Sequence, residues 1–83
     1  GKTVIFDTGG YQVKPGNAMV TMKGDMTGGA MVLAAVKALA ELNAPVAVTA
    51  YLAATPNKID SDAFIPDSIV NSSCGKKIEI RHT

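Results

Sequence analysis

Apolar and polar stretches alternate along the chain in a way that predicts two buried strands joined by a helix. Residues 3–6 (TVIF) form a short apolar run rich in β-branched residues, which is typical of a strand covered on both faces in a parallel sheet. Residues 28–42 are apolar at nearly every position, and this favours a helix that is buried on most sides. Residues 46–53 (VAVTAYLA) predict a second buried strand, and the strand–helix–strand order indicates a right-handed parallel unit.

The two ends of the predicted helix carry start and stop signals. Thr27 or Asp25 can cap its first turn. Asn43, Ala44 and Pro45 follow its last turn. We expect them to end the helix, because the residue before a proline is pushed out of the helical backbone region.

The rest of the chain predicts loops and a hairpin. Residues 11–27 have no clear period, which indicates a long loop of the kind that often carries function, and residues 55–67 are polar and loop-like. Residues 71–75 (NSSCG) lie between the apolar pair 69–70 and the alternating residues 77–81, as expected for a hairpin. We therefore predict an α/β fold: part of a mixed, mostly parallel sheet with a crossover helix, followed by a hairpin-like pair of strands.

Length and composition indicate a segment that packs inside a larger structure. The chain has 83 residues, of which 47% are hydrophobic, yet it contains only two Phe, two Tyr and no Trp. Alanine and valine supply much of the apolar content, and alanine fills space poorly. A chain of this size buries a modest fraction of its surface, so its core is marginal without further residues around it.

Charge and cysteine content exclude several classes of protein. Eight Lys and Arg are balanced by seven Asp and Glu, so the chain lacks the basic stripe or polybasic run that nucleic acid or a membrane surface attracts. The longest apolar stretch is interrupted by Lys37 and Glu41 and is too short to span a bilayer. Cys74 is the only cysteine, which fits a reducing, cytoplasmic location and excludes a disulfide-stapled scaffold.

Two aspartates are candidates for a cation site. Asp7 follows the first predicted strand, where ligands gather in open α/β sheets, and Asp25 precedes the helix, whose dipole favours an ionised carboxylate. Two carboxylates that meet repel each other unless a cation joins them, and their oxygens suit Mg, Mn or Zn. The alternative is that Asp7 begins a turn and Asp25 caps the helix, so that the two never meet.

Other polar features carry weaker hypotheses. Gly9-Gly10 follows a strand and Gly28-Gly29 opens a helix, as in anion-binding sites, but no phosphate-binding motif is present, so a nucleotide- or anion-binding module is a minor alternative. His82 has no partner at ligand spacing, and we expect a solvated histidine. Cys74 has no base beside it, and we expect an inert thiol.

The strongest signal is a resemblance that spans essentially the whole chain. Residues 1–10 (GKTVIFDTGG), Lys14-Pro15 and residues 22–26 (MKGDM) closely resemble the metal-binding stretch of the leucyl (cytosol) aminopeptidase family. The likeness continues through the alanine-rich helix and Pro45 to residues 75–79 (GKKIE). Several charged residues match in type and in spacing, which is more specific than a lone glycine pattern. The resemblance implies part of the C-terminal catalytic domain of a metallo-aminopeptidase.

Carried over by position, the resemblance implies a role for five residues. Lys2, Asp7 and Asp25 would be metal ligands, with Asp7 bridging two divalent ions, Zn or Mn. Lys14 would be the catalytic lysine that polarises the scissile carbonyl, and Met22 would line the apolar pocket for the substrate side chain. A lysine coordinates a metal only as the neutral amine, so the metal must shift its proton balance. The family also implies peptide substrates, a cytoplasmic location and a homo-oligomer, which is a hexamer in the family.

The chain also departs from the family. The family continues with Asp-Ala-Glu-Gly-Arg, which supplies further ligands, whereas this sequence ends at His82-Thr83, with His82 in place of the usual Asn. Val20 replaces a common Asp, and further replacements lie at residues 27–29, 56 and 67–68. We therefore expect residues 1–83 to be a partial catalytic domain, truncated before the remaining ligands and inactive alone. The alternative is a non-catalytic pseudoenzyme or interaction module of the same fold.

Overall fold

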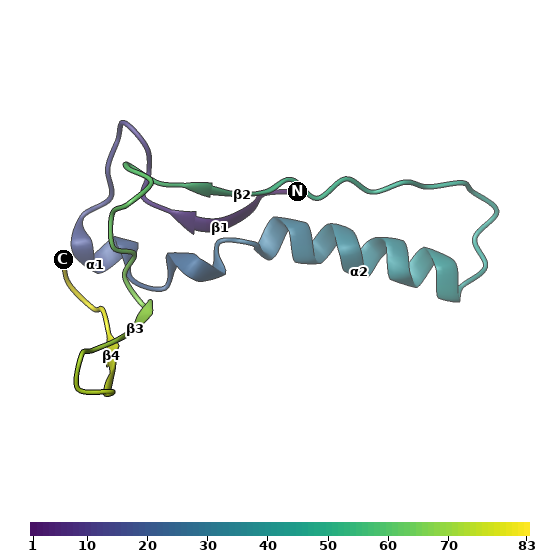
Figure 1. Cartoon of the computed structure of the whole chain (residues 1–83). Helices are drawn as coiled ribbons and strands as arrows, with labels where there is room; N and C mark the ends of the chain where they lie inside the picture. The colour runs from purple at the N-terminus through teal and green to yellow at the C-terminus, as the bar shows by residue number, and fades with distance from the viewer.

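The computed structural model describes all 83 residues and has two small sheets and one long helix (Figure 1). The helix lies in sequence between the two strands of the first sheet, and a loop leads from there to the second sheet. The elements, in order, are β1 (Thr3–Asp7), α1 (Gly16–Met19), the 3-10 turn η1 (Met22–Gly24), α2 (Thr27–Glu41), β2 (Ala54–Asn57), β3 (Ile69–Asn71) and β4 (Lys77–Glu79). Strands β1 and β2 pair in parallel, and β3 and β4 pair antiparallel. The predicted α/β class, with a helix between parallel strands and a hairpin after them, is confirmed.

The start of α2 is fixed against β1 by backbone hydrogen bonds. The Val4 N–H donates to the Asp25 carbonyl at 2.9 Å, and the Gly29 N–H donates to the Lys2 carbonyl at 2.8 Å. Gly29 is the only buried residue of α2, and a Cβ at this position would lie 2.2 Å from Thr3 Oγ1. The close approach therefore requires glycine, and it brings the residues just before α2 beside the first strand.

The second parallel strand is shorter and later than predicted. Residues 46–53 belong to no strand, and β2 begins only at Ala54. The parallel register pairs Thr3 with Ala54, so residues 46–53 extend past the amino end of β1 and have no strand beside them. Figure 1 shows this run following α2 back toward β1. A strand is defined by a hydrogen-bonded neighbour, and β-branched composition alone did not supply one.

The helix matches its predicted span and stops at the predicted segment 43–45, but the predicted N-terminal caps are wrong and the stop has a different cause. Met26 is the N-cap residue and no side chain caps the first turn. At the other end Asn43 adopts a left-handed backbone with φ of 50°. Its N–H donates to the Ala40 carbonyl at 3.1 Å, and the Ala44 N–H donates to the Leu39 carbonyl at 3.0 Å. This is a Schellman motif, so α2 already ends at Asn43, before Pro45 acts.

The predicted hairpin is confirmed, and a polar contact joins it to the loop that follows β1. Ile69 pairs with Glu79 and Asn71 pairs with Lys77. Asp67, just ahead of β3, accepts a hydrogen bond from the Thr21 N–H at Oδ2 (2.6 Å). The Asp67 side chain therefore holds the hairpin against the segment between α1 and η1. This segment belongs to residues 11–27, which were predicted only as a loop.

The chain encloses little core. Phe6 is the only buried hydrophobic residue, and the radius of gyration is 17.1 Å, whereas a compact chain of this length has about 12 Å. The prediction that α2 is buried on most sides is not met within this chain, because Met31 and Leu33 remain 68% and 57% exposed. The chain supplies only β1 and the returning segment 46–53 to cover it. None of the helices combines the length and apolar character needed to cross a membrane.

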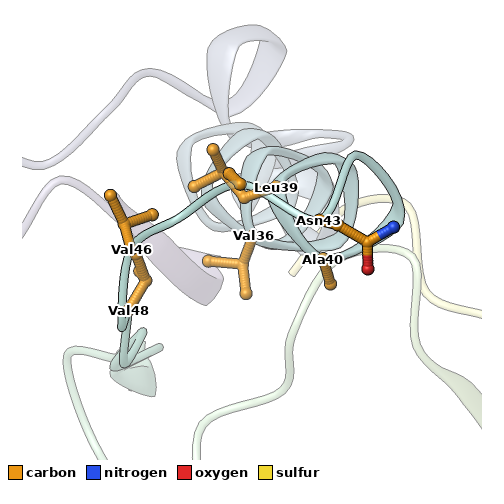
Figure 2. Close-up of a pocket in the computed structure, with 7 residues that line it drawn as sticks. Val36, Leu39, Ala40, Asn43, Val46 and Val48 are labelled. Atoms are coloured by element: carbon orange, nitrogen blue, oxygen red, sulfur yellow. The ribbon is translucent and has the colours of Figure 1, made fainter.

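One apolar pocket lies at the far end of α2. It has a volume of about 280 Å³, and Figure 2 shows Val36 and Leu39 of α2 with Val46 and Val48 of the returning segment around it. Val46 and Val48 are exposed. The pocket is therefore the place where residues 46–48 partly cover the helix, and it is remote from the end of α2 that meets β1.

Candidate functional site

Three charged residues meet where β1 and the start of α2 come together. Lys2 precedes β1, Asp7 ends it, and Asp25 directly precedes the first turn of α2. The Lys2 Nζ atom lies 2.9 Å from Asp7 Oδ2 and 2.8 Å from Asp25 Oδ2. The alternative in which the two aspartates serve separate local turns and never meet is wrong, because one ammonium group contacts both.

Asp7 is held in place at both carboxylate oxygens. Oδ1 accepts hydrogen bonds from the Gly9 N–H at 2.9 Å and from Asn57 Nδ2 at 2.7 Å, while Oδ2 accepts from Lys2. Asp7 is only 5% exposed. The Lys2 ammonium, then the Gly9 N–H and the Asn57 amide, hold the pKa of the Asp7 carboxyl well below its usual range, so Asp7 is ionised at neutral pH.

Lys2 carries the positive charge that the two carboxylates need when no metal is present. The close contact with the Asp25 carboxylate, and then the hydrogen bond to Asp7, raise the pKa of the Lys2 ammonium above its ordinary value. The Lys2 side chain is 56% exposed, so solvent and small ions reach this side of the cluster. A metal ion entering here would compete with the ammonium proton, and its binding would release that proton.

One oxygen of Asp25 has no hydrogen bond. Asp25 Oδ2 is buried and lies close to the Lys2 Nζ atom, but the contact lacks hydrogen-bond geometry. A buried acceptor without a hydrogen-bond donor is unfavourable, and a cation would satisfy it. Asp7 Oδ2, Asp25 Oδ2 and the Lys2 amine therefore form a donor set of two oxygens and one nitrogen, which fits Zn or Mn.

The ligand set available within this chain is small. No group of three or more His, Cys, Asp or Glu side chains that could hold a metal ion is present. The cluster therefore consists of the two carboxylates of Asp7 and Asp25 and the amine of Lys2. No further acidic or imidazole side chain joins them.

The two other predicted residues lie at different distances from the cluster. Lys14 Nζ is 3.9 Å from Asp7 Oδ2, and its backbone N–H donates to the Thr8 carbonyl at 2.8 Å, so the loop after β1 turns back and presents this second lysine to Asp7. Met22 begins η1 and is half-buried. It borders none of the pockets in this structure, and its role in a substrate pocket stays a prediction.

Gly9 allows the tight turn between Asp7 and Lys14. Its φ is +92°, and a Cβ there would lie 2.3 Å from the Gln12 carbonyl oxygen and 3.0 Å from the Lys14 backbone nitrogen. Both neighbours are backbone atoms that cannot rotate away. The same residue donates its N–H to Asp7 Oδ1, so the turn fixes the carboxylate and the second lysine together.

We expect Gly9→Ala to lower the free energy of unfolding by about 1–3 kcal/mol, because alanine would be strained at this positive φ and would press on the turn. Urea unfolding of the protein expressed from its complete gene measures the loss. Gly16→Ala is the matched control, since nothing lies within 4 Å of a Cβ at Gly16. Equal unfolding midpoints for the two variants would contradict the role given to Gly9.

Asn57 also contacts the cluster, and its role was not among the predictions from sequence. This residue ends β2 and pairs with Asp7 in the parallel register, and its side chain reaches the aspartate across the sheet. The available signal was a polar residue at the carboxyl end of a parallel strand, where ligand-binding side chains collect. Placing the second strand at 46–53 removed Asn57 from that position.

The structure forms no site around His82, Cys74 or the glycine pair 28–29. His82 is exposed. Cys74 is also exposed, and the Ser72 hydroxyl, then the Lys76 backbone, lower the pKa of its thiol, but no catalytic base contacts it. The Gly29 N–H donates to the Lys2 carbonyl, and a Cβ on Gly28 would lie 2.5 Å from the backbone nitrogen of Lys2. The start of α2 is therefore packed against backbone and is not open to an anion.

Comparison with known proteins covers the whole chain. The profile of the family described as "Cytosol aminopeptidase family, catalytic domain" matches residues 1–83. A probable cytosol aminopeptidase of Exiguobacterium sibiricum is 51% identical over 83 residues, which are 100% of this chain and 17% of that protein. A probable cytosol aminopeptidase of Metamycoplasma salivarium is 45% identical over 83 residues, 100% of this chain and 16% of that protein. The chain thus spans a small part of the length of these relatives. No solved structure matches it.

Proposed function

Since this chain belongs to the cytosol aminopeptidase family, we propose that the protein releases amino acids from the free amino ends of peptides by metal-dependent hydrolysis. The observation that carries the proposal is the convergence of the Lys2 amine with one oxygen each of Asp7 and Asp25. Asp25 is separated in sequence from Lys2 and Asp7 by the loop after β1, and its buried Oδ2 atom has no hydrogen bond. A donor set of this kind is expected where a protein holds a divalent cation.

In this proposal Lys2, Asp7 and Asp25 would be among the residues that hold two divalent ions, Zn or Mn. Bound ions of this type make water a nucleophile near neutral pH and polarise a carbonyl group. Lys2 must give up its proton to act as a ligand, whereas Asp7 is ionised at neutral pH because its pKa is held well below its usual range. Further ligands would have to come from residues outside these 83, because the cluster contains two carboxylates and one amine.

Lys14 is proposed as the group that stabilises negative charge on the substrate. Its side chain is 31% exposed and points toward Asp7, so it is open to a bound peptide and oriented by a fixed carboxylate. A positioned ammonium can donate to the oxyanion that forms when a peptide carbonyl is attacked. The backbone bond to Thr8 limits how far the residue can move away from the site.

Three further properties follow the family and complete the proposal. We place the protein in the cytoplasm, acting on peptide substrates as a homo-oligomer. The printed names of the relatives, both cytosol aminopeptidases, support the location and the substrate class. The oligomer rests on the family resemblance alone.

The direct test is hydrolysis of leucine p-nitroanilide by the protein expressed from its complete gene. After removal of metal with a chelator, we expect no release of p-nitroaniline, and we expect activity to return with Mn²⁺ or Zn²⁺. The N-acetylated substrate should not be cleaved, because an aminopeptidase requires the free amino end. Metal-independent hydrolysis, or equal hydrolysis of the blocked substrate, would contradict the proposal.

Lysine variants provide the control within the same assay. Lys14→Met should lower kcat by about 100-fold or more, the usual effect of removing one oxyanion donor. Lys37→Met should be neutral, because Lys37 lies on the surface of α2 in a pair with Glu41, and such exposed pairs contribute little. No turnover under any metal condition would instead favour the alternative, a non-catalytic interaction module of the same fold.

A further inference from the structure

We propose that Asn57 is a positioning residue for the cluster, which fixes Asp7 so that a single oxygen, Oδ2, faces the cations. This inference rests on the proposed function and adds a residue to its machinery. The hydrogen bond from Asn57 Nδ2 to Asp7 Oδ1 is 2.7 Å long and joins residues 50 positions apart. It is the only hydrogen bond that the Asn57 side chain makes.

The two oxygens of Asp7 have separate partners. Oδ1 receives two protein donors, the Gly9 N–H and the Asn57 amide. A carboxylate oxygen offers about two lone-pair sites, so Oδ1 is filled. Oδ2 faces two lysine side chains, with Lys2 Nζ at 2.9 Å and Lys14 Nζ at 3.9 Å. The arrangement directs one edge of the carboxylate to the protein and leaves the other for positively charged ligands.

The backbone of Asn57 is fixed by hydrogen bonds from Thr8, and this fixes where the side-chain amide begins. The Asn57 carbonyl accepts from the Thr8 N–H at 3.0 Å and from Thr8 Oγ1 at 2.8 Å. On the other side, Gly10 presents only hydrogen, and a Cβ there would lie 3.6 Å from both terminal atoms of the Asn57 side chain. The sheet therefore presents this amide to Asp7 through backbone contacts that do not depend on the side chain.

Loss of the amide would free the orientation of Asp7. The terminal torsion of aspartate is broad, so with Gly9 as the only remaining donor on Oδ1 the carboxylate can rotate and move Oδ2. Removing a residue that hydrogen-bonds to a metal ligand, without contacting the metal, typically lowers metal affinity by about 10–100-fold. Because the backbone bonds to Thr8 remain, the sheet itself should persist in the variant.

The test is Mn²⁺ binding to the chelator-treated protein expressed from its complete gene, measured by isothermal titration calorimetry. We expect Asn57→Ala to raise the Mn²⁺ dissociation constant by about 10–100-fold. Asn57→Asp keeps the size of the side chain but places an acceptor against Oδ1, so it should weaken binding as well. Asn71→Ala is the control, because Asn71 is an exposed residue at the end of β3. Thermal melting of each metal-free variant accompanies the titrations.

The outcomes separate this inference from the proposed function. Wild-type protein that binds Mn²⁺ in an Asp7-dependent way, while both Asn57 variants bind it equally well, would overturn the inference and leave the function intact. Wild-type protein that binds no Mn²⁺ would overturn both. Weaker binding in both Asn57 variants, with metal-free melting temperatures close to that of Asn71→Ala, supports the positioning role. Weaker binding that only tracks a fall in metal-free melting temperature counts against it.

Discussion

Asp7→Asn lowers kcat/KM for release of N-terminal leucine by more than about 100-fold, because removing even an outer partner of a metal ligand costs about 10–100-fold. Asparagine keeps the shape of the side chain but cannot replace the contacts. Oδ2 faces the Lys2 ammonium, and Oδ1 faces the donors of Gly9 and Asn57. Whichever way the new amide is turned, its NH₂ group meets another donor, and the negative charge is lost.

The measurement is steady-state hydrolysis of leucine p-nitroanilide with Mn²⁺, after circular dichroism has established that the variant is folded. Asp62→Asn is the matched control, since Asp62 is an exposed acid in the loop after β2 and its removal leaves the cluster untouched. Activity of Asp7→Asn within a few-fold of the control would show that Asp7 does not hold the catalytic ions.

The 83-residue polypeptide, produced by itself, self-associates at micromolar concentration. Its accessible surface is 6299 Å², whereas a folded monomer of this mass exposes about 4,700 Å². Much of the excess surface is apolar. Met31 and Leu33 of α2, the C-cap residue Leu42, and Val46 in the segment that follows are all exposed. Exposed apolar surface on this scale drives association, and the unpaired segment 46–53 offers free backbone groups to a second copy.

Light scattering and sedimentation velocity at several concentrations test this expectation. A concentration-independent monomer with a sharp, cooperative unfolding transition would show that these residues close a core of their own. We also expect this polypeptide to have no aminopeptidase activity with added Mn²⁺ or Zn²⁺, because two carboxylates and an amine are too few ligands for two ions. Turnover that disappears in Asp7→Ala would contradict that expectation.

Local patterns predicted the elements whose causes are local. The β-branched run at residues 3–6, the apolar run at 28–42 and the turn sequence at 71–75 all formed the expected structures. The second strand failed because pairing is non-local. Residues 46–53 have suitable composition, but the register that starts at Thr3 and Ala54 leaves them without a neighbour. Position in the register decided the result, and no window of sequence contains that information.

The contacts within the candidate site are also non-local, and local sequence did not predict them. Spacing alone left open whether Asp7 and Asp25 meet, because the answer depends on how α2 docks through Gly29. The family resemblance predicted Lys2, Asp7 and Asp25 as ligands, and the structure places both aspartates within hydrogen-bonding distance of the Lys2 ammonium. Asn57 was not predicted, because its role depends on the register of β2, and the second strand was expected at residues 46–53.

The polar attachment of the hairpin gives this part of the chain a different stability from the rest. No residue of β3 or β4 is buried, and Asp67 joins the hairpin to the preceding loop through the Thr21 N–H and Lys23. Asp67 has a φ of 65°, a left-handed backbone that is uncommon outside glycine but that aspartate adopts more readily than most residues. Segments with few buried apolar contacts open at low free energy as cooperative units. The hairpin therefore forms a separate foldon, whose amides exchange with solvent sooner than those of β1 while the lysine–aspartate cluster stays closed.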